Sequence, residues 1–255
     1  MKLILAFLCF LFSIGISSQE VKVTYIANEG VLLEKDSIKV VIDGFFSDGL
    51  RIYEEPSKAV LSQMKTATGT FSDVDYILVT HIHNDHFNKN LINEYLSKNP
   101  VCKVISSNQI IDQLDEKFKD QLFGYDFLKK GEWKVFKEKG IEIKMGRMMH
   151  PYHKNRNIIN LAYQVQLGES SYLHIGDADM LVSNFQNLKI KEQRFDGAFV
   201  PFWFLIDSKG RQILKNHLVS KIVYAIHISK DGNYSIKNLD KPRFSLEILR
   251  SPSKN

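Results

Sequence analysis

Cysteine is nearly absent from this sequence, which has two cysteines in 255 residues. Cys9 lies in an apolar N-terminal stretch, and Cys102 lies in a strand-like segment, Val101–Ile105. If the N-terminal stretch is removed, the mature chain keeps one cysteine and forms no internal disulfide. We therefore expect Cys102 to be a small buried hydrophobic residue, and any metal site to use nitrogen and oxygen ligands instead of thiolates.

Long apolar runs are missing after residue 18. Leu3–Ile16 is apolar almost throughout, but its roughly 14 residues fall short of the 18 to 20 that a membrane-spanning helix needs. A basic residue, Lys2, precedes the run and small residues follow it, which predicts a secretory signal peptide over residues 1–18. An uncleaved N-terminal anchor is the alternative. The protein is thus expected to be secreted or periplasmic, with no membrane span once the signal is removed.

Excess charge of one sign is missing as well. The sequence has 34 Lys and Arg against 29 Asp and Glu, a net charge of +5 that becomes +4 when Lys2 leaves. No run of basic residues stands out, so nucleic acid is not the expected partner. Linkers rich in proline, glycine or serine, low-complexity tracts and repeats are also lacking. We expect one domain over residues 19–255 that acts on a small molecule; the oligomeric state stays open.

Strand and helix patterns occur in both halves of the chain. In the first half, strands are predicted at Val21–Ile26, Val31–Glu34, Ile38–Ile42, Tyr76–Thr80 and Val101–Ser106, and helices at Pro56–Thr66, Asn88–Ser97 and Asn108–Phe118. In the second half, strands are predicted at Trp133–Phe136, Ile141–Met148, Leu161–Leu167, Tyr172–Ile175, Asp196–Pro201 and Ile222–Ile226, and a helix at Gln212–Leu218. Each half has strands first and helices after, which predicts an α/β (α+β) fold of two sheets packed face to face with helices outside.

Three histidines and one aspartate lie within six residues, directly after the apolar strand at Tyr76: His81, His83, Asp85 and His86. Isolated histidines are usually satisfied surface or core groups, but such a cluster would be costly to leave without partners. Alternation along the strand would place His81 and His83 on one face, with Asp85 and His86 reaching the same region from the start of the next helix. The spacing predicts a metal site.

Three more strand patterns end in residues that can bind metal. His150 follows Ile141–Met149, Asp177 follows a glycine at the exit of the strand near Tyr172, and His227 follows Ile222–Ile226. Four separate strand ends that each offer histidine or aspartate are hard to explain by packing alone. His153 lies three residues after His150; we favour His150 as the ligand because it ends the strand, which leaves His153 to face substrate or solvent.

Thr80-His-Ile-His-Asn-Asp-His86 resembles the Thr-His-x-His-x-Asp-His signature of the metallo-β-lactamase superfamily, and the later histidines and aspartate match that family's ligand order. The resemblance covers essentially the whole mature chain. It implies a four-layer αββα sandwich with two divalent metal ions, usually Zn²⁺, at one edge of the sheets. It also implies which residues hold them: His81, His83 and His150 the first ion, Asp85, His86 and His227 the second, with Asp177 bridging both.

The chemistry follows from this ligand set. Two cations that share Asp177 can also share a water and lower its pKa from 15.7 toward about 7, which makes a nucleophile at neutral pH. Asp85 is a candidate to carry a proton, although a ligand has little freedom to move. Asp43 is expected to orient a ligand from behind, and His174 to support the site or the fold. The expected activity is hydrolysis of an ester, lactone or amide-like small substrate.

The substrate is less sharply defined than the metal site. True β-lactamases of the superfamily typically have a cysteine where Asp177 stands, which argues against β-lactam hydrolysis. The short stretch after His227 leads us to expect a compact, lactonase-like form. Trp203 is expected to line the substrate pocket, with an aromatic cluster at the edge of the core as an equal alternative. Two other functions stay open: a phosphodiesterase or nuclease on the same metals, and a non-catalytic metal-binding module.

Overall fold

The computed structural model describes residues 20–47, 52–127, 129, 131–138, 140–151, 157–231 and 244–249. The expected signal peptide, residues 1–18, and His153 lie outside these ranges. Among the helices of the described ranges, none combines the length and the apolar character needed to cross a membrane.

The first half of the chain builds a six-stranded sheet whose strands follow one another in sequence order: β1 (Lys22–Ala27), β2 (Gly30–Lys35), β3 (Ile38–Ile42), β4 (Tyr76–Leu78), β5 (Lys103–Ser107) and β6 (Leu122–Tyr125). Short turns join β1, β2 and β3, so these strands pair antiparallel. From β3 to β6 the pairing is parallel, as the alternation of strands and helices predicts. The carboxyl ends of β3 and β4 therefore meet at one edge of the sheet.

The second half builds a seven-stranded sheet in the order β13-β12-β11-β10-β9-β8-β7. Its strands are β7 (Trp133–Glu138), β8 (Ile141–Met148), β9 (Asn160–Leu167), β10 (Ser170–His174), β11 (Phe195–Pro201), β12 (Ser220–Ile226) and β13 (Ser245–Ile248). Pairing is antiparallel from β7 to β10 and parallel from β10 to β13. As a result β8, β10 and β12 point the same way and end at the same edge.

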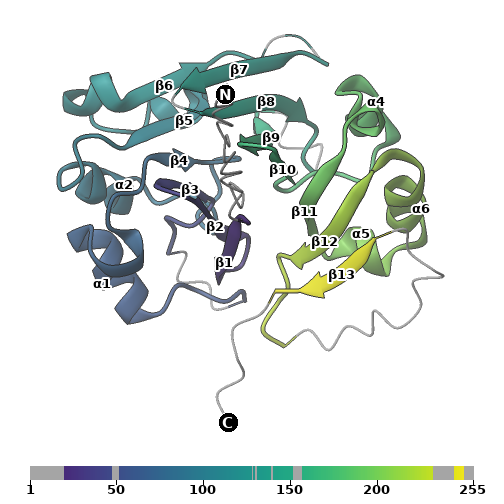
Figure 1. Cartoon of the computed structure of the whole chain (residues 1–255), viewed down its shortest axis with the longest axis horizontal. Helices are drawn as coiled ribbons and strands as arrows, with labels where there is room; N and C mark the ends of the chain where they lie inside the picture. The colour runs from purple at the N-terminus through teal and green to yellow at the C-terminus, as the bar shows by residue number, and fades with distance from the viewer. Residues whose placement is uncertain are drawn as a thin grey trace, which may run out of the picture.

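Helices cover the outer face of each sheet. The first sheet carries α1 (Lys58–Thr66), α2 (Lys89–Leu96) and α3 (Asn108–Ile111), and the second carries α4 (Val182–Asn187), α5 (Trp203–Ile206) and α6 (Ser208–His217). Three short 3₁₀ helices are η1 (Gly69–Phe71), η2 (Glu116–Gln121) and η3 (Ile190–Glu192). Figure 1 shows the two sheets facing each other, with α1 and α2 on one outer side and α4 and α6 on the other. The predicted four-layer αββα sandwich is confirmed.

An apolar core fills the space between the sheets, with side chains such as Val40, Leu78, Val165 and Phe199 fully buried. Tyr163 of β9 also crosses this space: its hydroxyl lies 2.8 Å from the carbonyl oxygen of Val79 and 3.0 Å from that of Ile105. This contact ties the second sheet to the carboxyl end of β4, where the histidine cluster begins.

The helix predicted at Asn108–Phe118 is wrong in its length, because α3 stops at Ile111 and η2 follows. The cause is tertiary: the backbone N–H of Asp115 donates to the side-chain oxygen of Asn93 on α2, at 3.2 Å, instead of continuing the helix. The predicted helix at Gln212–Leu218 in fact begins at Ser208, because the side chain of Asp207 caps it. The helix expected at Pro56 begins two residues later.

Among the α-helices and strands of the described residues, four lack a sequence prediction: β6, α4, α5 and β13. Each is short, between four and six residues, and carries no full period of apolar residues. Cys102 is fully buried against the helices of the first sheet, as expected, and burial raises the pKa of its thiol well above the usual range.

Candidate metal centre

The histidine cluster does not lie on a strand. β4 ends at Leu78, and His81 and His83 follow in irregular backbone, so strand alternation is the wrong reason for their proximity. Asp85 and His86 likewise precede α2 instead of opening it. The backbone N–H of His86 donates to the carbonyl of His83 at 3.0 Å, which closes a tight turn. This turn brings the four side chains back to one place, as predicted, and Ile82 packs the other way into the core.

His81, His83 and His150 form what we term the three-histidine group. His81 Nε2 lies 2.9 Å from His83 Nδ1, so two imidazole nitrogens that can each carry a lone pair point at one another. His150 arrives from the end of β8, and its Nε2 lies 3.4 Å from Asp177 Oδ2. His81 Nε2 lies 3.7 Å from the same oxygen. The ligand-type atoms of these four residues lie within 4.8 Å of one another.

Asp85, His86 and His227 form a second cluster, which we term the Asp85 group. Asp85 Oδ2 lies 3.7 Å from His86 Nε2 and 3.4 Å from His227 Nε2. His227 comes from the end of β12, and its backbone has the rare positive φ of 59°. The other oxygen of Asp177, Oδ1, lies 3.6 Å from His86 Nε2 and 3.4 Å from His227 Nε2.

Asp177 thus stands between the two groups, with one carboxylate oxygen facing each. Its place is set by Gly176, whose φ of +51° puts it in the left-handed region. A Cβ atom on Gly176 would lie 2.4 Å from Asn160 Oδ1, the oxygen that accepts the backbone N–H of Asp177 at 3.0 Å. Glycine is therefore required at this exit from β10, and Asn160 holds the backbone of the aspartate that follows it.

Hydrogen bonds on the outer nitrogens orient several of the imidazoles. His86 Nδ1 lies 2.9 Å from Asp43 Oδ2 and donates to it, which leaves Nε2 to face the centre. Asp43 itself accepts from the backbone N–H of Thr80 at 2.7 Å. His150 Nδ1 donates to the carbonyl of Pro151 at 2.6 Å, which turns its Nε2 toward Asp177.

Burial and charge act in opposite directions on the ionisable groups of the centre. Burial lowers the pKa of His81 well below its usual range, and the neighbouring histidines lower it further. Burial alone would raise the pKa of Asp177, but the facing imidazoles, His227 and His86 foremost, lower it well below its usual range. Burial would also lower the pKa of His86, yet the surrounding carboxylates raise it well above the usual value.

A metal centre fits these side chains. His86 Nε2, His227 Nε2 and Asp177 Oδ1 are buried atoms that have no hydrogen-bond partner within the described part of the chain. Buried polar atoms are rarely left in that state, because each costs about 1 to 3 kcal/mol. All three point into the same small space, and imidazole nitrogen with carboxylate oxygen is a donor set that divalent cations accept.

The turn between β1 and β2 also contributes to the site, which the sequence analysis missed. Asn28 Nδ2 lies 3.3 Å from the carbonyl of Asp85 and 3.4 Å from its Oδ2. Glu29 is fully buried, and its Oε2 lies 3.6 Å from His86 Nδ1. Burial and the nearby Asp177 raise the pKa of Glu29 well above its usual range. In sequence, Asn-Glu-Gly has the composition of an ordinary hairpin turn, and only the acid's fully buried position distinguishes it.

Asn184 of α4 is another residue that the sequence did not reveal. Its side-chain oxygen accepts the backbone N–H of Met149 at 2.8 Å. Its amide nitrogen lies 3.1 Å from the carbonyl of Met149 and 3.0 Å from that of Asp179. One buried amide thus fastens the segment before His150 to the segment after Asp177.

Two further predicted residues lie near the centre. His174 is fully buried, accepts the backbone N–H of Gly176 at 3.1 Å and, through Nε2, donates to the carbonyl of Glu29 at 3.1 Å. Its two nitrogens are used inside the fold. Trp203 begins α5, with its ring 5.1 Å from the ring of His227 and its Nε1 donating to the carbonyl of Ala178 at 3.1 Å. Tyr53 packs on His227 as well, at 4.2 Å between ring centres.

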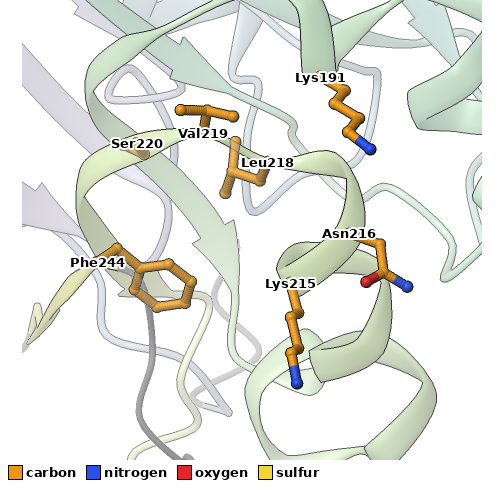
Figure 2. Close-up of a pocket in the computed structure, with 7 residues that line it drawn as sticks. All are labelled: Lys191, Lys215, Asn216, Leu218, Val219, Ser220 and Phe244. Carbon is orange, nitrogen blue, oxygen red and sulfur yellow. The ribbon is translucent and has the colours of Figure 1, made fainter.

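A cavity of about 290 Å³ lies elsewhere on the second sheet, beside α6 and β12. Figure 2 shows its lining, in which Lys191 and Lys215 stand near the apolar side chains of Leu218, Val219 and Phe244. None of the predicted metal ligands lines it. This cavity is therefore separate from the cluster of predicted ligands at the strand ends.

Comparison with known proteins agrees with the fold. The sequence model of a protein family described as the β-lactamase superfamily domain matches residues 22–227. A candidate metal-dependent hydrolase from Parabacteroides distasonis is 16% identical, with a TM-score of 0.61 over 89% of this chain and 92% of that one. Igni18, a metallo hydrolase from the archaeon Ignicoccus hospitalis, is 19% identical, with a TM-score of 0.58 over 82% of each chain.

A third similar structure is CmlA, a diiron β-hydroxylase from Streptomyces venezuelae. It is 16% identical, with a TM-score of 0.56 over 82% of this chain and 45% of that one. The comparison with curated proteins finds no match. At these identities the solved structures show a shared fold, while the family match spans most of the sequence. The chain belongs to the metallo-β-lactamase superfamily and has the fold of its metal-dependent hydrolases.

Proposed function

We propose that this protein is a hydrolase with a dinuclear metal centre that acts on an ester, lactone or amide-like small substrate. One observation carries the proposal: the two oxygens of Asp177 face two separate clusters, the three-histidine group at Oδ2 and the Asp85 group at Oδ1. A carboxylate in that position can bridge two cations. His81, His83 and His150 would hold the first cation, and Asp85, His86 and His227 would hold the second.

When bound, two such cations supply a water of lowered pKa as the nucleophile and stabilise negative charge that develops on the substrate. The residues of the chain hold this centre in place. Asp43 fixes the tautomer and direction of His86 through the bond to Nδ1. Asp85 and Asp177 are carboxylates that would hold the cations, so we assign to them the orientation of the attacking water.

The aromatic rings of Trp203 and Tyr53 flank His227 at the Asp85 group. We propose that they form an apolar wall that contacts the substrate, because aromatic side chains are frequent in the lining of small-molecule sites. Aspartate at the bridging position in place of cysteine supports a substrate other than a β-lactam. The apolar segment at residues 3–16 supports export to the periplasm or the medium.

Zinc is the metal that we propose for the first position, because three imidazole nitrogens suit it well. CmlA, which shares the fold, is named a diiron enzyme, so iron is the alternative that metal analysis has to separate from zinc. The test starts with the mature protein, residues 19–255, whose metal content is measured after purification and after chelation. We expect about two cations per chain and a melting temperature that falls when they are removed.

A substrate panel completes the test. Lactone, aryl ester, amide and phosphodiester reporters are assayed with the metal-loaded and the metal-free protein. We expect metal-dependent turnover of a lactone or ester. Turnover of the phosphodiester alone would assign the same centre to a phosphodiesterase instead. Failure to bind any divalent cation, with no thermal stabilisation when cations are added back, would overturn the dinuclear proposal as a whole.

A further inference from the structure

Glu29 is a carboxylate that the proposed ligand set does not use. Its side chain is fully buried in the turn between β1 and β2, and neither of its oxygens has a hydrogen-bond partner among the residues that the structure describes. Withdrawing a carboxylate from water without such partners is strongly unfavourable unless it takes up a proton or a positive charge compensates for it. The Nδ1–H group of His86 donates a hydrogen bond to Asp43 at 2.9 Å, while Glu29 Oε2 lies 3.6 Å from the same nitrogen.

The backbone around Glu29 is fixed, so the side chain has no route to solvent through a local shift. The carbonyl of Asn28 accepts the backbone N–H of His227 at 3.2 Å, and the carbonyl of Glu29 accepts from His174 at 3.1 Å. On the next residue, a Cβ atom on Gly30 would lie 2.9 Å from the Cα atom of Gly44, so the two backbones are already in contact. The fold itself therefore keeps the acid inside the centre.

A separate cation held by Glu29, Asp43 and His174 does not fit, although the three are neighbours. Both nitrogens of His174 already have partners, and both oxygens of Asp43 accept hydrogen bonds from Thr80 or His86. The remaining neighbours of Glu29 are His86 and Asp177, whose ligand-type atoms lie with its own within 4.8 Å. These two belong to the Asp85 group and to the bridge.

We propose that Glu29 is an additional ligand of the second cation, beside Asp85, His86, His227 and Asp177. The inference rests on the dinuclear centre proposed above and adds a carboxylate to one side of it. The first cation would then have mainly imidazole nitrogen around it, whereas the second would have three carboxylates and two imidazoles. Oxygen-rich sites suit Mn²⁺ and Fe²⁺ better than nitrogen-rich ones do. The two positions therefore differ in metal preference, with Zn²⁺ at the first and Mn²⁺ or Fe²⁺ favoured at the second.

The experiment compares metal binding by the wild type, Glu29→Gln and Glu169→Gln. Glutamine has the same shape as glutamate without the charge, and Glu169 is an exposed acid in the turn between β9 and β10, so its variant is the matched control. Metal-free proteins are titrated with Zn²⁺ and with Mn²⁺ by calorimetry, and the bound Mn²⁺ is followed by electron paramagnetic resonance. Circular dichroism checks the fold of each variant, and melting curves are recorded with and without metal.

For Glu29→Gln we expect the second cation to bind at least about tenfold more weakly, with the first unchanged and the preference for Mn²⁺ at the second position reduced. The metal-free variant should melt higher than the metal-free wild type, because a buried acid is gone, and should gain less from added metal. A merely structural role would change the melting temperatures of the metal-free and the metal-loaded protein by the same amount. Glu169→Gln should match the wild type throughout.

Wild-type affinity and Mn²⁺ preference in a folded Glu29→Gln protein would overturn the inference while leaving the dinuclear centre intact. A wild type that binds no metal would overturn the proposed function and the inference together. Glu29→Asp covers the case in which the glutamine variant does not fold. It keeps the charge but shortens the side chain by one methylene. If Glu29 is a ligand, this variant should bind the second cation more weakly and the first as the wild type does. Wild-type affinity for both cations would refute the ligand role.

Discussion

The three-histidine group and the Asp85 group differ in what surrounds them. Around the three-histidine group, the outer contacts are neutral: Thr80 Oγ1 for His81 and the carbonyl of Pro151 for His150. Around the Asp85 group they are charged or polar: Asp43 accepts from His86 Nδ1, and Asn28 contacts Asp85. The same types of ligand are therefore set in different electrostatic surroundings. If the proposed dinuclear centre forms, this difference predicts that its two cations would be held with different strength and selectivity.

Asp177→Asn should have the largest effect, because it removes the one charge that both groups share. The amide has one oxygen in place of two, so it cannot face both clusters as a carboxylate does. We expect both cations to bind at least about 100-fold more weakly and hydrolysis to be lost. Metal content after dialysis measures this, with Asp120→Asn, an exposed acid of η2, as the control. Retention of two tightly bound cations would contradict the bridging role.

His81→Ala separates the two groups. His81 is fully buried in the three-histidine group, so its removal should empty the first position and abolish hydrolysis while the second cation stays bound. The fold should persist, as far-ultraviolet circular dichroism would report. His217→Ala, on α6 and outside the ligand clusters, should keep wild-type turnover. Turnover by His81→Ala would disprove the catalytic assignment.

Asp43→Asn tests the opposite side of the comparison. Asp43 accepts from Thr80 and from His86, so an amide nitrogen in its place would face a donor and disturb the orientation of His86. We expect the second cation to bind about 10- to 100-fold more weakly, with the first affected much less. Calorimetric titration separates the binding of the first cation from the binding of the second. Equal weakening of both would show that Asp43 supports the fold in general and not the Asp85 group.

Cys102→Ala should affect neither group. The thiol is fully buried against the helices of the first sheet, and the variant should lose about 1 kcal/mol of unfolding free energy in urea. Both metal affinities should stay at wild-type values. Because its pKa is raised, the native thiol should also react slowly with a thiol reagent at pH 8 and quickly in denaturant. A shift in either metal affinity would link this core to the centre.

The sequence predicts correctly which histidines and aspartates lie together, because their positions in the chain mark them. His81, His83, Asp85 and His86 lie within six residues, and His150, Asp177 and His227 each follow an apolar strand. These last three share one edge because β8, β10 and β12 point the same way, through two antiparallel pairings between β8 and β10 and parallel pairing from β10 to β12. The reason for the proximity of His81 and His83 was nevertheless wrong, since a tight turn and not a strand brings them together. The role of these residues as ligands stays a prediction.

The supporting residues could not be predicted in the same way. Asn28, Asn160 and Asn184 act through side-chain contacts with segments elsewhere in the chain, such as Asn184 with Met149, and Glu29 is distinguished by its burial. No local pattern marks them, because asparagine and glutamate in turns and at helix ends are common. The early end of α3 has the same origin: a contact from α2 overrides a good helical pattern. His153 and the signal peptide, outside the described residues, stay predictions.

The turn between β1 and β2 has a consequence for the order of folding. It accepts backbone and side-chain hydrogen bonds from His227 and His174 of the second sheet while Asn28 contacts Asp85 of the first half. These contacts join residues 28 and 227, so they form only after both halves have docked, and the centre is completed late. Interactions absent from the folding transition state mainly slow unfolding. We therefore expect bound cations to lengthen the lifetime of the native protein while barely changing how fast it folds.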